Sequence, residues 1–147
     1  MRVSYFALIL GIAFLLVGVL AFVPGMVQTP PADAHELHVT GPGHGYLLGL
    51  FHVNVLHNLV HLLFGLWGVL AYRSVSGSIT YARIVAISYG VLAIMGLIPV
   101  LNTLFGLVPI HGADVLLHAV IAAAAAYFGF LAPAADRDVA PVTSSPR

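Results

Sequence analysis

The sequence contains no cysteine, no lysine and few charged residues of either sign. The absence of cysteine excludes disulfides, thiolate metal sites, c-type haem attachment and cysteine nucleophiles. Without lysine, no side-chain amine can form a Schiff base. Five arginines balance five acidic residues, and a net charge of zero gives no indication that the protein binds nucleic acid.

Hydrophobic residues make up 61% of the 147 residues, and the mean hydropathy is +1.05. A soluble domain of this length needs more polar surface than a chain with only 7% charged residues can provide. We therefore predict an integral membrane protein, surrounded by the lipid bilayer and built as one compact bundle.

Four apolar stretches are long enough for a membrane-spanning helix, which needs roughly 20 residues. They cover about residues 5–23, 47–72, 81–101 and 113–131. The fold class predicted is thus an all-α membrane protein with four transmembrane helices. All the arginines then fall on one side, and the positive-inside rule makes that side cytoplasmic. Both termini are predicted to be cytoplasmic, in a multi-pass protein of the cell inner (plasma) membrane.

The predicted bundle occupies residues 1–133, with residues 24–46 as an outer loop that contains prolines unfavourable to helix. Residues 134–147 are rich in Pro, Ser and Ala and are predicted to be a disordered cytoplasmic tail. The polar segment Arg73–Ser78 is predicted to be a short turn that joins two antiparallel helices. The outer loop carries three histidines, whose role the sequence leaves open: His35, His38 and His44.

Histidine is unusually frequent, with eight residues. The second predicted span contains N-V-L-H-N-L-V-H, in which Asn54, His57, Asn58 and His61 recur at helical spacing. This spacing predicts that all four side chains project from one face of a helix. Polar side chains are costly in a membrane, so the segment indicates a packed interface, a cofactor site or a conduction path.

A shift of 57 residues aligns the second span with the fourth. Under this shift L-x-G-L at residues 47–50 meets L-x-G-L at 104–107, His57 meets Asp114, and His61 meets His118. The faint repeat suggests two helical hairpins related by a pseudo-two-fold axis along the membrane normal. Two i, i+4 pairs on facing helices could then supply four ligands around one point.

The first interpretation of these residues is a buried His/Asn/Asp cluster between spans two and four that organises helix packing through interhelical hydrogen bonds. The second is a site for zinc or another transition metal. Its ligands would be His57, His61 and His118, with Asp114 as a fourth ligand or as the carboxylate that orients an imidazole. Asn54 and Asn58 would then bind water or substrate.

Alternatives from other classes stay open. In one, the protein is a metal- or haem-dependent membrane enzyme or electron carrier, with haem b between His61 and His118. Four small residues would open space for the porphyrin, namely Gly65, Gly68, Ala122 and Ala125. In another, the protein is a homo-oligomer or an accessory subunit of a larger membrane complex, docked through small-residue faces. A through-membrane proton path is disfavoured, because the residues inward of His61 are apolar. The catalytic residues and the substrate are left undefined.

Two segments carry a resemblance to a known class of proteins. They are L-L-G-L-F-H-V-N-V-L-H-N-L-V-H-L-L-F-G-L-W-G at residues 47–68 and N-T-L-F-G-L-V-P-I-H-G-A-D-V-L-L-H at residues 102–118. The chain resembles an uncharacterised family of four-span bacterial membrane proteins, a domain-of-unknown-function class common in actinobacteria. N-x-x-H-N-x-x-H and G-A-D-x-x-L-H are its most specific parts. The resemblance implies four transmembrane helices and brings no established activity.

Overall fold

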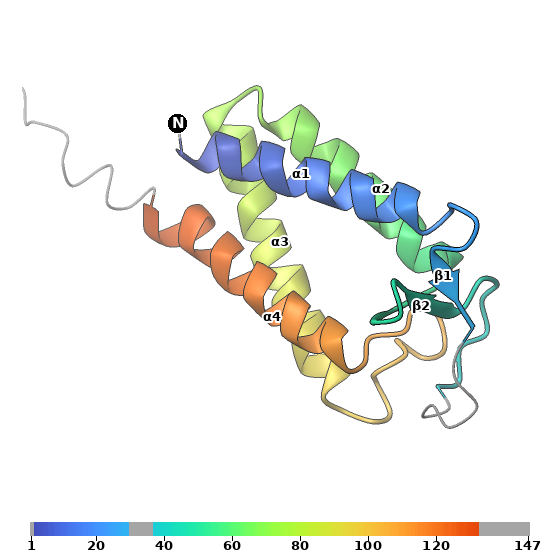
Figure 1. Ribbon diagram of the computed structural model, residues 1–147. Helices are drawn as coiled ribbons and strands as arrows, with labels where there is room; N and C mark the ends of the chain where they lie inside the picture. The colour runs from blue at the N-terminus through green and yellow to red at the C-terminus, as the bar shows by residue number, and fades with distance from the viewer. Residues whose placement is uncertain (1, 30–36, 133–147) are drawn as a thin grey trace, which may run out of the picture.

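The computed structural model describes residues 2–29 and 37–132 and is mostly helical (Figure 1). The predicted tail at 134–147 and His35 lie outside these residues. Four α-helices follow one another along the chain, and a π-helical turn, η1, extends the last of them. They are α1 (Arg2–Leu20), α2 (Val55–Ala71), α3 (Val75–Gly96), α4 (Ala113–Ala126) and η1 (Tyr127–Leu131).

Three of these helical segments are long and apolar enough to cross a membrane: Val3–Leu20, Val75–Gly96 and Ala113–Leu131. α2 is apolar as well, but it is shorter, with 17 residues. Their outward surfaces are strongly apolar, and side chains such as Ile9, Leu63 and Leu116 are about two-thirds exposed. A chain with such surfaces is compatible with a lipid environment.

α1 and α2 form the first helical hairpin and run side by side along its length (Figure 1). Glycines allow the two backbones to approach closely. A Cβ atom on Gly11 would lie 2.7 Å from the backbone nitrogen of Val69, and one on Gly65 would lie 2.7 Å from that of Leu15. Small residues at such positions are typical of helix pairs in membranes.

α3 and α4 form the second hairpin. A Cβ atom on Gly129, in η1, would meet the backbone nitrogen of Arg83 at 3.0 Å. The Arg83 side chain turns to this same place, and its Nε donates a hydrogen bond of 2.9 Å to the Gly129 carbonyl. Because a π-helical turn disturbs the regular i to i−4 pattern, this arginine provides the turn with a donor from the neighbouring helix.

The two hairpins meet in an aromatic core. Phe14 of α1 stacks on Tyr89 of α3, with ring centroids 5.3 Å apart, and Tyr81 and Val85 are fully buried beside them. At the other end of α1, Phe6 stacks on Phe128 at 4.6 Å. The N-terminal end of α1 and the end of η1 therefore lie at the same end of the bundle (Figure 1).

The structure corrects the start of the second predicted span. Residues 47–53 are not helical, because they belong to a small antiparallel sheet of three strands. The strands are β1 (Val27–Gln28), β2 (Gly45–Leu47) and β3 (Phe51–Val53), in the order β1-β2-β3. Tyr46 pairs with His52, and Leu47 with Phe51. A short apolar run is compatible with either a buried strand or a helix, and here the backbone turns back on itself.

The third predicted span is shifted by about one and a half turns. α3 begins at Val75 and not at residue 81, because Ser74 caps it: its Oγ accepts a hydrogen bond from the backbone nitrogen of Gly77. The predicted polar turn at Arg73–Ser78 is therefore mostly the first turn of the helix. α3 ends at Gly96, three residues before Pro99, which disfavours continuation of the helix.

Candidate functional site

The polar residues singled out in the sequence gather at one end of the bundle. The N-termini of α2 and α4 both lie at this end, beside the sheet and the loop of residues 97–112 (Figure 1). We call this end the cap end. Within the described residues, the side chains of Asn54, His57, Asn58, Asp114 and His118 are each less than a tenth exposed.

Asn54 is not part of the helical face that was predicted, because it is the N-cap of α2 with an extended backbone. Its Oδ1 accepts a hydrogen bond of 2.8 Å from the backbone nitrogen of His57. Its Nδ2 donates one of 2.7 Å to the carbonyl of Leu107, in the loop before α4. One fully buried side chain therefore starts α2 and ties the first hairpin to the second.

Three histidine rings from two helices lie close together. The ring centroids of His57 and His61 are 4.5 Å apart, and those of His57 and His118 are 6.2 Å apart. Two of the three rings also stack on aromatic residues of the core. The His61 ring lies 5.5 Å from the Phe14 ring, and the His118 ring lies 4.8 Å from the Tyr89 ring. We refer to His57, His61 and His118 as the buried histidines.

The carboxylate of Asp114 is hydrogen-bonded to β3. Its Oδ2 accepts a hydrogen bond of 2.9 Å from the backbone nitrogen of His52 and lies 3.7 Å from Nδ1 of the same residue. Only the main-chain carbonyl of Asp114 contacts His118, at 2.6 Å from its Nδ1. The first turn of α4 also favours a carboxylate at this position, through the helix dipole. Asp114 therefore joins β3 to α4.

Several buried polar atoms in this region lack hydrogen-bond partners. In the described part of the chain, Nδ1 of His57, Nδ1 of His61 and Oδ1 of Asn58 have none. Such atoms are uncommon, since each costs free energy when left unpaired. Nevertheless, within residues 2–29 and 37–132 no group of three or more His, Asp or Glu side chains is arranged to hold a metal ion.

The small residues considered for a porphyrin space have other neighbours. A Cβ atom on Gly68 would lie 2.8 Å from the carbonyl oxygen of Ala7, so Gly65 and Gly68 both serve the contact with α1. Ala122 lies opposite Gly90 of α3, and Ala125 is fully buried in the core. Gly65 and Gly68 therefore pack against α1, Ala122 lies against α3, and Ala125 belongs to the core.

The predicted repeat has a counterpart in the backbone. Leu48 and Gly49 have φ of 54° and 72°, and Phe105 and Gly106 have φ of 59° and 89°. These pairs are related by the same shift of 57 residues. Two consecutive left-handed residues are uncommon, and glycine adopts this conformation at low cost. The loops that precede α2 and α4 thus share this pair of residues, although Leu104 adds a third positive φ, 43°, in the second loop, where its counterpart Leu47 belongs to β2.

A second group of histidines covers the cap end, and the sequence did not single it out. The ring centroid of His52, on β3, lies 6.2 Å from that of His44 and 5.8 Å from that of His111. Burial and the neighbouring His52 lower the pKa of His44, which therefore favours its neutral form. Only recognition of the β2-β3 hairpin would have brought these residues together.

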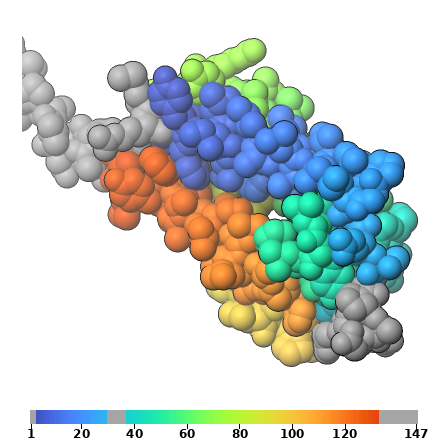
Figure 2. Space-filling view, in the orientation of Figure 1, coloured from blue at the N-terminus to red at the C-terminus, as the bar shows by residue number. Residues whose placement is uncertain are grey.

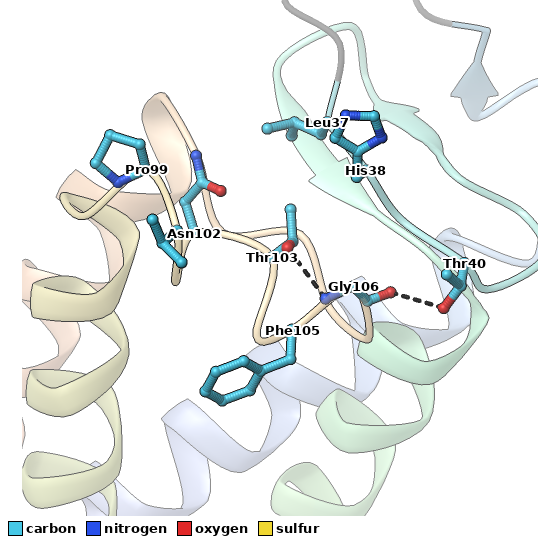
Figure 3. Close-up of a pocket in the computed structure, with 9 residues that line it drawn as sticks. Leu37, His38, Thr40, Pro99, Asn102, Thr103, Phe105 and Gly106 are labelled. Atoms are coloured by element: carbon cyan, nitrogen blue, oxygen red, sulfur yellow. Dashed lines mark hydrogen bonds between the residues drawn. The ribbon is translucent and has the colours of Figure 1, made fainter.

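The loop before α4 is also joined to the outer loop. The hydroxyl of Thr40 donates a hydrogen bond of 3.0 Å to the carbonyl of Gly106, whose nitrogen donates to Oγ1 of Thr103 (Figure 3). His38 lies beside them and lines a hollow of about 460 Å³ between the two loops. His38 thus belongs to the outer surface of the cap end and not to the buried histidines.

The family model for a domain of unknown function, DUF4383, matches residues 4–131. The chain belongs to this family. No curated protein and no solved structure gives a match. The expectation of an uncharacterised family is thereby confirmed, and the match covers every helix from α1 to η1.

Proposed function

We propose that this member of the DUF4383 family is a four-span protein of the inner (plasma) membrane, with both termini cytoplasmic. The stacking of Phe6 on Phe128 supports the shared side of the termini, because it joins the start of α1 to the end of the last helix. The sheet and the loop of residues 97–112 would then face outward. The N-x-x-H-N-x-x-H and G-A-D-x-x-L-H segments are expected to recur across the family.

The absence of cysteine makes this topology directly testable. Thr29, after β1, and Ser76, in the first turn of α3, are exposed at opposite ends of the bundle, so each can be replaced by Cys without disturbing the core. We expect a membrane-impermeant maleimide to label Thr29→Cys in intact cells and Ser76→Cys only after lysis. Labelling of both variants in intact cells, or of Ser76→Cys alone, would refute the proposed orientation.

The role proposed for the cap end is to join the two hairpins and to bind a ligand at their junction. The observation that carries this proposal is the pair of unpaired Nδ1 atoms on His57 and His61, whose side chains are 4% and 9% exposed. A buried imidazole nitrogen that has no protein partner is suited to accept an ion or a ligand hydrogen bond. A transition metal is the first candidate, since neutral imidazole is a good ligand for zinc and copper.

A metal would require rotation of the three imidazole rings, because the described residues do not place them around a common point. Asp114 is not free to act as a fourth ligand, since its carboxylate is bonded to His52. We expect purified protein to retain about one zinc or copper ion per chain, and His57→Ala to abolish this. His38→Ala is the matched control, since His38 lies on the outer surface. The measurement is elemental analysis after dialysis, with an absorption spectrum to report haem. An equally low metal content in the native protein, His57→Ala and His38→Ala would exclude metal binding by the buried histidines. Their remaining role would be to pack the helices together.

A further inference from the structure

A cavity of about 180 Å³ lies between α1 and α4, next to the buried histidines. These two helices diverge toward the cap end, and the surface between them is hollowed beside residues 47–53 (Figure 2). Phe14 and Val17 of α1 form one wall, and Leu117 and Ile121 of α4 form the other. Phe51 and other residues of the β2-β3 hairpin close the cavity at the cap end.

The walls are almost entirely apolar, and the polar groups are few and placed on one side. His61, Tyr89, His118 and Asp114 line the cavity, and the Asp114 carboxylate already accepts a hydrogen bond from the backbone of His52. The rings of His61 and His118 are stacked at the two ends of the Phe14–Tyr89 pair. Nδ1 of His61 has no hydrogen-bond partner in the described residues, although the side chain is only 9% exposed. An apolar pocket with a few convergent polar groups is the usual form of a small-molecule site.

The volume limits what can bind. An apolar cavity of about 150 Å³ holds one benzene ring, so a cavity of about 180 Å³ accommodates one six-membered ring with small substituents. The flat faces of Phe14 and Tyr89 are stacked on each other and on the two histidines, so a planar ring in the cavity packs edge-on against this aromatic row. A porphyrin or a fused polycyclic molecule is too large for this space.

The cavity opens sideways, between the helices. Ala13, Leu48 and Leu117 line it and are themselves exposed, Leu48 by 59% and Leu117 by 41%. In the membrane placement proposed above, on which this step rests, that opening faces lipid. A ligand that enters from the bilayer can leave its apolar tail between α1 and α4, in hydrocarbon.

We propose that this cavity binds a lipid-soluble molecule whose head is a single planar ring bearing an oxygen, the class of the alkyl benzoquinones and phenols. The ring lies against Phe14 and Tyr89, and its oxygen forms a hydrogen bond with the imidazole of His61. The tail leaves past Ala13 and Leu117. The site needs no metal ion.

The test uses the full chain in lipid nanodiscs, incubated with 2-decyl-1,4-benzoquinone and quantified by mass spectrometry after gel filtration. Empty nanodiscs give the amount that partitions into lipid. We expect about one additional quinone per chain. Ala13→Phe should lower the affinity at least tenfold, because the new ring fills the opening. Ile12→Phe is the matched control and should bind normally, since Ile12 is exposed and does not line the cavity.

Two further comparisons test the polar contact. His61→Phe keeps a ring against Phe14 and should weaken quinone binding about fivefold, the loss of one hydrogen bond, while leaving decylbenzene binding unchanged. Binding should also survive treatment with EDTA, which separates this proposal from the metal site.

Equal binding by Ala13→Phe and Ile12→Phe would overturn the cavity assignment. Equal retention of decylbenzene, decanoic acid and the quinone by the native chain would overturn the ring-and-oxygen assignment. If circular dichroism shows that His61→Phe is unfolded, the comparison of Ala13→Phe with Ile12→Phe decides whether the ligand binds in the cavity.

Discussion

Replacement of Gly11 by alanine is expected to destabilise the protein by about 1–3 kcal/mol, the usual cost of overpacking. The added methyl group would lie 2.7 Å from the backbone nitrogen of Val69 and 2.9 Å from the carbonyl oxygen of Gly65. These are backbone atoms of α2 and cannot rotate away as a side chain does. The two helices of the first hairpin must therefore separate. Thermal unfolding in a mild detergent measures the effect.

Gly90→Ala is the matched control for this prediction. It makes the same chemical change in another helix, but the new Cβ atom would meet only Ala122, at an ordinary distance of 4.0 Å. Alanine also restricts the unfolded chain more than glycine does, so this variant should be neutral or more stable by about 0.4–1 kcal/mol. A similar loss of stability in both variants would show that the Gly11 contact with α2 is not the cause.

Asn54→Ala is expected to lower the free energy of unfolding by about 2–4 kcal/mol. Loss of the N-cap of α2 contributes about 1 kcal/mol. Loss of the donor to the Leu107 carbonyl leaves a part-buried backbone acceptor without its partner, at about 1–3 kcal/mol. The measurement is again thermal unfolding, and hydrogen exchange in residues 102–110 should rise because the loop has lost its tie to α2.

Ser74→Ala separates the two contributions of Asn54. Ser74 caps α3 with the same kind of hydrogen bond, to the backbone nitrogen three residues later, but its bond is exposed and joins nothing else. This variant should lose only about 1 kcal/mol. If Asn54→Ala and Ser74→Ala prove equally destabilising, the bond between Asn54 and Leu107 contributes nothing to stability.

The sequence predicted correctly those segments whose pattern is compatible with only one type of secondary structure. The fourth apolar stretch, at 113–131, matches the structure because Gly112 precedes it and Pro133 follows it. The start of the second stretch could not be predicted from hydropathy, since residues 47–53 are apolar in either a helix or a hairpin. The hairpin depends on the left-handed backbone at Leu48 and Gly49.

The sequence predicted one part of the candidate site and missed the part that depends on the β2-β3 hairpin. The repeat indicated that His57, His61 and His118 belong together, and their rings do lie close to one another. It could not indicate that the Asp114 carboxylate bonds to His52, because that contact needs the unforeseen strand β3. The position of Asn54 at the N-cap, and not on the helical face, follows from this shorter helix. Whether the buried histidines bind a metal stays a prediction.

The small sheet has a further consequence for the surrounding lipid. Because residues 47–53 form the hairpin, α2 has 17 residues and a length of about 25 Å, whereas α3 has 22 residues and a length of about 33 Å. The hydrocarbon core of a bilayer is about 30 Å thick. In the four-span placement proposed above, lipids beside α2 would compress, whereas α3 would tilt or the lipids beside it would stretch, at a cost of fractions of a kcal/mol per Å of mismatch. The bilayer around the protein would then be thinner beside α2 than beside α3.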